Sequence, residues 1–386
     1  MENPMPGRTK TLDFASKAAL FMLACCAIVT PISIISIGSE LGISLASRGG
    51  LETARTIPLI ATILVSGVIT GRASLKLLIS AGLWLMTAGL VLMGLSKTFP
   101  VAVIAMVVLG AGSGFIEALI NPIVTSLHPD TPELHLNTAH AFFSIGLCIC
   151  VLLFGELLSR GLSWRTLYFM SSIGTLGTAI LFQASHFPEN TPDRFSGRTY
   201  LGILKRPLFW IFCLTMFFSA GNEGGLTFWT ASFIETYYSD VPRLWGFGTA
   251  IFGFSMAVGR MTIGRLSAHV PVKLILLIAA GGGVLVSALI AYTTRLSAVM
   301  VLIFAAGLCT SGFWPSVLAL ASKRIHTDTT AVFTLLISSG IGGFAAFPWL
   351  IGVVGDSAGL RGAFFIIPAL FLILVPLLLL MRPEKS

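Results

Sequence analysis

Two glutamates lie deep inside long apolar stretches of the sequence. Glu117 falls within residues 100–127 and Glu223 within residues 209–237. An acidic side chain near the middle of a bilayer is energetically costly, so it usually marks a functional site. A carboxyl group buried in this way also holds a proton more readily than one in water. We interpret both glutamates as candidate proton-coupling residues; a structural hydrogen bond to a neighbouring helix is the alternative.

Glu117 is part of a longer pattern of small and polar residues. Its members share one face of a predicted helix and are Gly110, Gly114, Glu117 and Asn121. Small residues allow another helix to approach closely, and the polar pair then points into a helix bundle. Pro122 frees a carbonyl one turn earlier, which favours a bend at this point. Glu117 and Asn121 are therefore our strongest candidates for a functional site inside the membrane.

Further polar and aromatic side chains are candidates for the same site. Asn222, next to Glu223, has an amide that can both donate to and accept from a hydroxyl group, and we count both residues as substrate-binding candidates. His140 could relay a proton from Glu117, although a histidine near a helix end more often caps that end. The remaining candidates, one hydroxyl group and two aromatic walls, are Ser144, Phe143 and Trp314.

The composition requires that membrane helices position these side chains. The 386 residues are 55% hydrophobic and 10% charged, with a mean hydropathy of +0.92. A water-exposed domain has roughly 25% charged residues, so soluble enzymes, nucleic-acid binders and disordered scaffolds are excluded. The net charge of +8 is what Lys and Arg in cytoplasmic loops produce. All six cysteines lie in apolar stretches and indicate no disulfide framework.

Twelve apolar stretches are long enough to cross the roughly 30 Å core of a bilayer as helices. Residues 187–208, rich in proline and charge, separate six of them from the other six. We predict an all-α integral membrane protein with an N-terminal six-helix bundle (1–186), a cytoplasmic linker (187–208) and a C-terminal six-helix bundle (209–386). The predicted spans are 18–38, 51–71, 77–96, 100–127, 138–158, 166–186, 209–237, 244–266, 274–293, 297–321, 331–353 and 361–381.

Lys and Arg are distributed unevenly between the two sides that this layout creates. Sixteen lie on the side of the termini and eight on the other. Because basic residues are enriched in cytoplasmic loops, both termini are predicted to be cytoplasmic. We expect a multi-pass protein of the cell (inner) membrane.

The two halves of the chain resemble each other, as in folds built from repeated helix units. Residues 113–115 and residues 311–313 both read Ser-Gly-Phe, at an offset of 198. Together with the division into six and six spans, this is similar to the major facilitator architecture of two pseudo-symmetric six-helix bundles.

Five segments resemble the fucose, galactose and glucose:proton symporter branch of the major facilitators. Span four resembles the G-x-x-E-x-x-x-N-P pattern of that branch, and the start of span five resembles its L-N-x-x-x-x-F-x-x-x-G pattern. Shorter matches lie in spans seven, eight and ten. The segments are 114–125, 136–146, 220–223, 259–265 and 312–315.

The resemblance implies a proton-coupled sugar symporter that works by alternating access, with Glu117 in its cavity. It also implies a cytoplasmic gate made of basic residues; topological charge alone is the alternative. The implied gating residues are Arg72, Lys76, Arg260 and Arg265. The fucose symporter has a coupling aspartate in span one, whereas span one of this chain has no acidic residue. Either Glu223 takes that role from span seven or coupling differs.

Two other functions are compatible with parts of the pattern. A proton-driven exporter of amphipathic compounds would share the fold, but Asn121, Asn222 and Ser144 favour a polar substrate. A receptor or sensor would need a sizeable soluble domain, which we do not expect. The sequence has no phosphate-binding loop, Cys/His metal spacing or Ser/His/Asp set, so we expect no enzyme activity, cofactor or metal. The expected partners are a small-molecule substrate, a coupling proton and the lipid bilayer, with no nucleic acid, and we expect a monomer.

Overall fold

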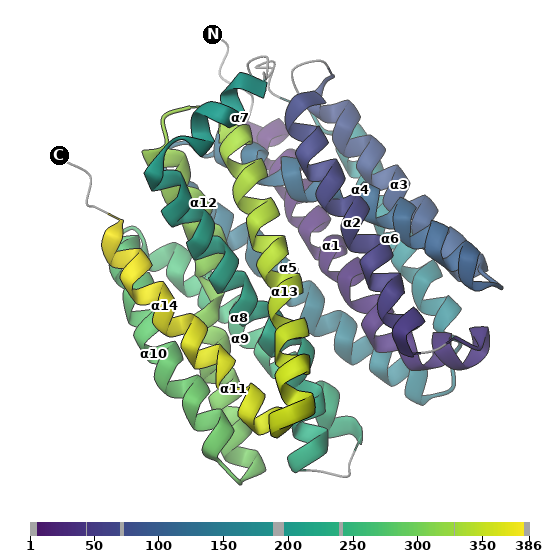
Figure 1. Ribbon diagram of the computed structural model, residues 1–386. Coiled ribbons are helices and arrows are strands. Elements are labelled where there is room, and N and C mark those ends of the chain that lie inside the picture. Colours follow the sequence, from purple (N-terminus) through teal and green to yellow (C-terminus); the bar gives the residue numbers. More distant parts are fainter. Residues whose placement is uncertain are drawn as a thin grey trace. The chain divides into compact units, whose positions relative to one another are not determined.

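The computed structural model describes residues 6–43, 45–69, 73–187, 197–238, 242–327 and 329–381, and this part of the chain is almost entirely helical. The helices are α1 (Pro6–Leu41), α2 (Leu45–Ile69), α3 (Leu75–Leu95), α4 (Phe99–Leu127), α5 (Pro132–Ser159), α6 (Trp164–Ala184), α7 (Gly197–Leu204), α8 (Pro207–Tyr237), α9 (Pro242–Leu266), α10 (Val272–Tyr292), α11 (Leu296–Ser311), α12 (Phe313–Arg324), α13 (Thr329–Ala363) and α14 (Ile366–Leu380) (Figure 1).

Ten of the predicted spans each coincide with one long helix. Span ten is formed by the pair α11 and α12, and span twelve by the last residues of α13 together with α14. The predicted all-α membrane fold is therefore confirmed. Within the described part of the predicted linker, residues 187 and 197–208, the chain forms the short helix α7 and the start of α8. Within the described residues, eight helical segments are long and apolar enough to cross a membrane, and nine if the bent pair 357–363 and 366–380 forms one span. Long helices that fall outside this set include α8 and α9, which carry the charged pair described below.

The chain divides into two compact units. Unit 1 consists of Met1–Pro129 and Ile149–Thr199, and unit 2 consists of Asp130–Cys148 and Tyr200–Ser386. The boundary inside α5 means that the first part of this helix belongs to unit 2 and its last part to unit 1. Span five is therefore shared between the two units.

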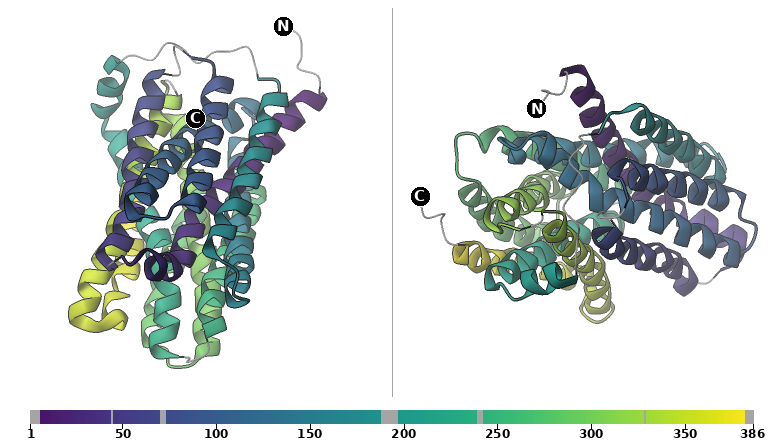
Figure 2. Two further views of the ribbon diagram at one scale, coloured as in Figure 1. Left: turned by 90° about the vertical axis from the view of Figure 1, so that its right-hand side faces the viewer. Right: turned by 90° about the horizontal axis from the view of Figure 1, so that it is seen from above.

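In unit 1, glycine faces bring α2 and α3 against α4. A Cβ atom added at Gly110 of α4 would lie 2.0 Å from the carbonyl oxygen of Arg55 on α2, and one at Gly112 would lie 2.5 Å from the carbonyl oxygen of Gly82 on α3. The backbones approach this closely only because these positions have no side chain. Helices α3 and α4 consequently run side by side along their length (Figure 2).

In unit 2, a second glycine-rich contact joins α8 to α13. A Cβ atom at Gly224 of α8 would lie 2.7 Å from the carbonyl oxygen of Phe344, and one at Gly343 of α13 would lie 1.9 Å from that of Phe217. The glycines that follow Asn222 and Glu223 therefore face α13 and fix the position of α8.

One stabilising contact occurs in both units. Lys76, in the first turn of α3, donates from Nζ to the carbonyl of Gln183 at the end of α6 (2.6 Å). Lys273, in the first turn of α10, donates in the same way to the carbonyl of Leu379 at the end of α14 (3.1 Å). A cation at a helix C-terminus binds carbonyls that have no partner within the helix. The equivalent lysines support the internal repeat found in the sequence.

Candidate functional site

Unit 2 contains a buried ion pair between α9 and α8. Arg260 is 1% exposed, and its Nη2 lies 3.2 Å from both carboxylate oxygens of Glu223, which is itself buried. Removing two charges from water is costly unless they pair closely and their remaining donors find acceptors. The pair therefore depends on what else surrounds the guanidinium group.

The other two nitrogen atoms of Arg260 also have acceptors, on two further helices. Its Nη1 donates to the carbonyl of His140 (2.9 Å) and to Oγ of Ser144 (2.6 Å), both on α5. Its Nε donates to the carbonyl of Ser311 at the end of α11 (3.0 Å). Four helices, α5, α8, α9 and α11, thus meet at one arginine.

The Ser311 carbonyl is available because of a proline one turn later. In an α-helix the carbonyl of residue i accepts from the N–H of residue i+4, and for Ser311 that residue is Pro315, which has no N–H. The helix is interrupted at this point, where α11 ends at Ser311 and α12 begins at Phe313. Nε of Arg260 takes the place of the missing donor.

This placement corrects the location expected for Arg260. The sequence pattern predicts that it lies with Arg265 in a cytoplasmic basic cluster. In the structure Arg260 lies inside the helix bundle of unit 2, whereas Arg265 is exposed in the last turn of α9. Lys76 binds the end of α6, as described above, and Arg72 lies outside the described residues. The signal was present in the sequence, because Arg260 falls within predicted span eight.

The first part of α5 presents a polar stripe to other helices of unit 2. Nζ of Lys323 on α12 lies 2.6 Å from Oε1 of Glu133. One turn further, Nδ2 of Asn137 donates to Oγ of Ser316, also on α12 (3.2 Å). The two α5 groups that bind Arg260 continue the same face. The α5 stripe, residues 133, 137, 140 and 144, therefore fastens α5 to unit 2 at three levels.

Two predicted substrate-binding residues of unit 2 are buried and have unpartnered polar atoms. Asn222 is 0% exposed, and within the described structure neither its Oδ1 nor its Nδ2 has a hydrogen-bond partner. Trp314 is also buried, its Nε1 has no partner either, and the tip of its ring lies beside Gly340 and Met216. Buried polar groups are nearly always hydrogen-bonded in folded proteins. Each of these two side chains therefore indicates a point at which another molecule can supply the partner.

The remaining α5 candidates have different surroundings. The side chain of His140 is buried, and Ser144 is buried with its hydroxyl group bound to Arg260. Phe143, which lies between these two residues in the sequence, is only half-buried. Of these three residues, the structure links His140 and Ser144 to the arginine.

In unit 1, the predicted pair of Glu117 and Asn121 lies on α4. Glu117 is half-buried, and Asn121 is 0% exposed and donates from Nδ2 to the carbonyl of Glu117 (3.2 Å). A Cβ atom at Gly114 would lie 2.5 Å from the carbonyl oxygen of Leu59 on α2. The glycines of the sequence pattern thus contact α2, which agrees with the predicted close approach of another helix.

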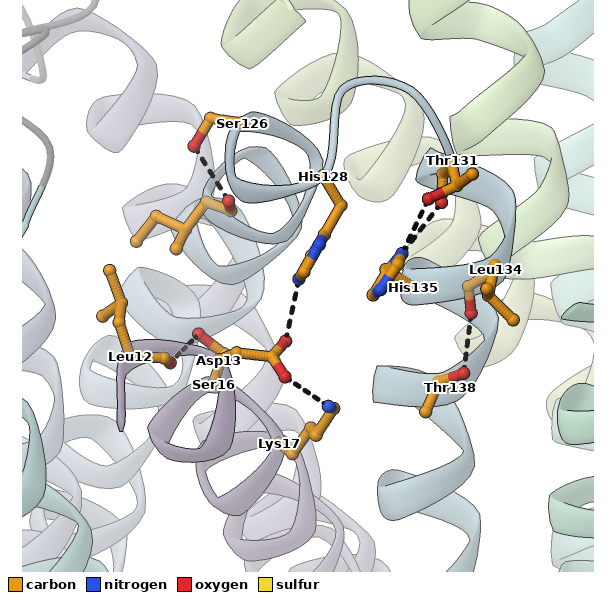
Figure 3. Close-up of polar contacts among 11 residues, drawn as sticks. Leu12, Asp13, Ser16, Lys17, Ser126, His128, Thr131, Leu134, His135 and Thr138 are labelled. Atoms are coloured by element: carbon orange, nitrogen blue, oxygen red, sulfur yellow. Dashed lines mark hydrogen bonds and ion pairs between the residues drawn. The ribbon is translucent and has the colours of Figure 1, made fainter. Parts of the chain in front are cut away.

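A polar cluster at the N-terminal end of α1 was not anticipated. Asp13 lies between Lys17, with which it forms an ion pair, and His128 at the end of α4, whose Nε2 is 3.4 Å from Oδ1 of Asp13 (Figure 3). These contacts connect α1 to α4 within unit 1. Sequence spacing gives no signal for a contact across 115 positions. Within the residues that the structure covers, no group of three or more His, Cys, Asp or Glu side chains could hold a metal ion.

Comparison with known proteins identifies the fold. An uncharacterized MFS-type transporter of Yersinia pestis is 23% identical over 347 residues, 86% of each chain. The structure of FucP in the outward conformation matches with a TM-score of 0.82 at 17% identity, over 96% of this chain and 99% of that chain. The proton:xylose symporter XylE bound to 6-bromo-6-deoxy-D-glucose matches with a TM-score of 0.83 at 11% identity, over 98% and 97%.

The family assignment rests on the sequence itself. The family model of the Major Facilitator Superfamily matches residues 18–294 and 242–386, which together cover most of the chain. Proteins of this family are multi-pass membrane transporters and not enzymes, and the twelve-span layout agrees with it. The protein belongs to the major facilitator superfamily.

Proposed function

We propose that this transporter is a proton-coupled symporter of a small sugar, working by alternating access in the inner membrane with both termini in the cytoplasm. The observation that carries the proposal is Asn222, which is fully buried with neither polar atom of its amide bonded. A substrate rich in hydroxyl groups would supply both a donor and an acceptor to this amide. The likeness in fold to XylE and to the E. coli fucose:proton symporter FucP supports the same substrate class.

Trp314 suits the same kind of ligand. Its Nε1–H is an unpartnered donor on an otherwise apolar ring, so it can bind a hydroxyl group at its edge and the C–H face of a sugar ring on its surface. An amphipathic export substrate carries few polar groups, whereas a sugar carries several hydroxyl groups that can pair with both Asn222 and Trp314. The two unpartnered groups therefore favour a sugar over the exporter alternative.

We assign proton coupling to Glu117 and a structural role to Glu223. Both oxygens of Glu223 are occupied by Arg260, and protonation of this glutamate would leave a buried arginine without its counter-charge, at a cost of several kcal/mol. Glu117, half-buried on α4 beside Asn121, is the better proton carrier. The carbonyl of His140 binds Arg260, and this scheme requires no proton relay through its side chain.

Uptake into proteoliposomes tests the proposal. Labelled hexoses and 6-deoxyhexoses are offered, with and without an inward proton gradient, to the wild type, to Glu117→Gln and to Glu156→Gln. Glu156 is the control, because its side chain is exposed near the C-terminal end of α5, away from the α5 stripe. We expect one sugar to accumulate only with the gradient, and only Glu117→Gln to lose this accumulation. If no sugar moves while protons exchange for a hydrophobic dye, the exporter function replaces the proposal.

A further inference from the structure

We propose that Arg260 is a positioning residue for the sugar site in unit 2: it supplies the hydrogen bond that Pro315 cannot make and so fixes Trp314 and Asn222 in place. Only the mention of a sugar rests on the proposed function. The contacts among Arg260, Ser311 and Glu223 come from the structure alone.

Arg260 acts first on the start of α12. Trp314 lies between Ser311, whose carbonyl is bound by Nε of Arg260, and Pro315, which leaves that carbonyl without its helical donor. An unbonded carbonyl in an apolar bundle would turn to find another partner, and the first turn of α12 would turn with it. By holding the carbonyl, Arg260 holds the direction in which Trp314 leaves the backbone.

Arg260 also acts on α8. Nη2 of Arg260 binds both oxygens of Glu223, the residue that directly follows Asn222. The glycine contact with α13 fixes α8 on one side, and the ion pair fixes it on the side of α9. The backbone that carries the unpartnered amide of Asn222 is therefore held at two points.

Arg260 has no contact of its own with Asn222 or Trp314 among its hydrogen bonds. Each of its nitrogen atoms is already used, so it has no donor left for a ligand. Its effect on binding is exerted through Ser311 and Glu223. The role differs from both a gating charge and a substrate ligand.

A lysine at position 260 separates the two parts of this role. Arg260→Lys keeps a positive charge for Glu223 but has no Nε–H and no planar fork, so the Ser311 carbonyl loses its donor. Pro315→Ala supplies an N–H four residues after Ser311, which can close the helical hydrogen bond without the arginine. The two substitutions should therefore compensate each other.

The test is a double-mutant cycle with two readouts, the KM for uptake of the transported sugar and the thermal unfolding midpoint in detergent without sugar. In the wild-type background we expect Arg260→Lys to raise KM by about tenfold with little change in kcat, because about tenfold corresponds to the loss of one charge-assisted hydrogen bond. In the Pro315→Ala background the same substitution should raise KM much less. Pro376→Ala, in α14, is the matched control and should give no compensation.

The two readouts keep the outcomes distinct. Equal effects of Arg260→Lys in both backgrounds, in KM and in the unfolding midpoint, would overturn the proposal. Compensation in the unfolding midpoint but not in KM would show that Arg260 is purely structural, which also overturns it. If the wild type transports no sugar, the proposed function fails, and compensation in the unfolding midpoint still decides whether Arg260 replaces the missing donor of Pro315.

Discussion

Replacing Gly110 by alanine should destabilise the protein by forcing α2 away from α4. The added Cβ would lie 2.0 Å from the carbonyl oxygen of Arg55, whereas ordinary contact begins at 3.4 Å, so the two backbones must separate by about 1.4 Å. The obstacle is a backbone atom and cannot rotate away. Gly110 lies two turns before Glu117, and the separation should therefore also reduce transport.

The magnitude follows from two opposing effects. Overpacking of a well-packed interior costs roughly 1–3 kcal/mol, and a shift of this size against backbone belongs at the upper end. Alanine gains roughly 0.5–1 kcal/mol over glycine within a helix. The net expected loss is about 2 kcal/mol.

Gly177→Ala in α6 is the matched control, because nothing lies within 4 Å of the Cβ that it would add. It should gain the helical preference alone, so the two variants should shift the unfolding midpoint in opposite directions. The assay is the loss of monodisperse protein on heating in detergent, together with initial uptake rates. A Gly110→Ala protein as stable as the wild type, beside a Gly177→Ala protein that behaves as expected, would refute the close approach of α2 and α4.

Three further predictions concern buried polarity, the polar stripe and pH. Asn222→Leu should raise the unfolding midpoint and abolish sugar uptake, because it removes two unpartnered polar atoms that only the substrate satisfies. A lowered midpoint would show that the amide has a partner within the protein. A cross-link between cysteines placed at Glu133 and Lys323 should raise the unfolding midpoint, because it replaces the ion pair that joins the first part of α5 to α12 within unit 2 by a covalent bond. Each single cysteine is the control, and an unchanged midpoint with a complete cross-link would contradict the expectation. Glu40 lies outside the membrane span of α1, and the Arg165 guanidinium holds its pKa below the usual 4.5. The ion pair therefore stabilises the protein above about pH 4.5, and this stabilisation is lost as the pH falls through the lowered pKa. Glu40→Gln should make the unfolding midpoint slightly less sensitive to acid, and identical pH profiles for variant and wild type would argue against it.

The length and apolarity of sequence stretches predicted the helices well. A span needs about 20 apolar residues, and that requirement is local, so each predicted span is found as helix. The polar candidates Glu117, Asn121, Asn222 and Trp314 were found because polar or proline-flanked residues in apolar surroundings are conspicuous. Their roles in coupling and binding stay predictions.

The central role of Arg260 in unit 2 does not follow from its position in the sequence alone. Lys and Arg near the ends of spans are expected in cytoplasmic loops, although burying a basic charge is as costly as burying an acidic one. The same reasoning would have singled it out, since it falls inside span eight. The hydrogen-bond partners of Arg260 could not be predicted from the sequence. Pro315 indicates which carbonyl lacks its helical donor, but not which distant side chain binds that carbonyl. Contacts across 120 and 51 positions depend on how helices pack.

The shared helix α5 has a consequence for biogenesis. The chain is synthesised from its N-terminus, so residues 130–148 enter the membrane long before α9 and α12 exist. Until those helices are inserted, the α5 stripe lacks its hydrogen-bond and ion-pair partners, which are Lys323, Ser316 and Arg260. A fragment beginning at residue 209 would likewise carry a buried arginine that lacks two of its acceptors. Separately expressed halves cut in the linker should therefore assemble only when both are inserted together, with the first half supplying α5 to the second.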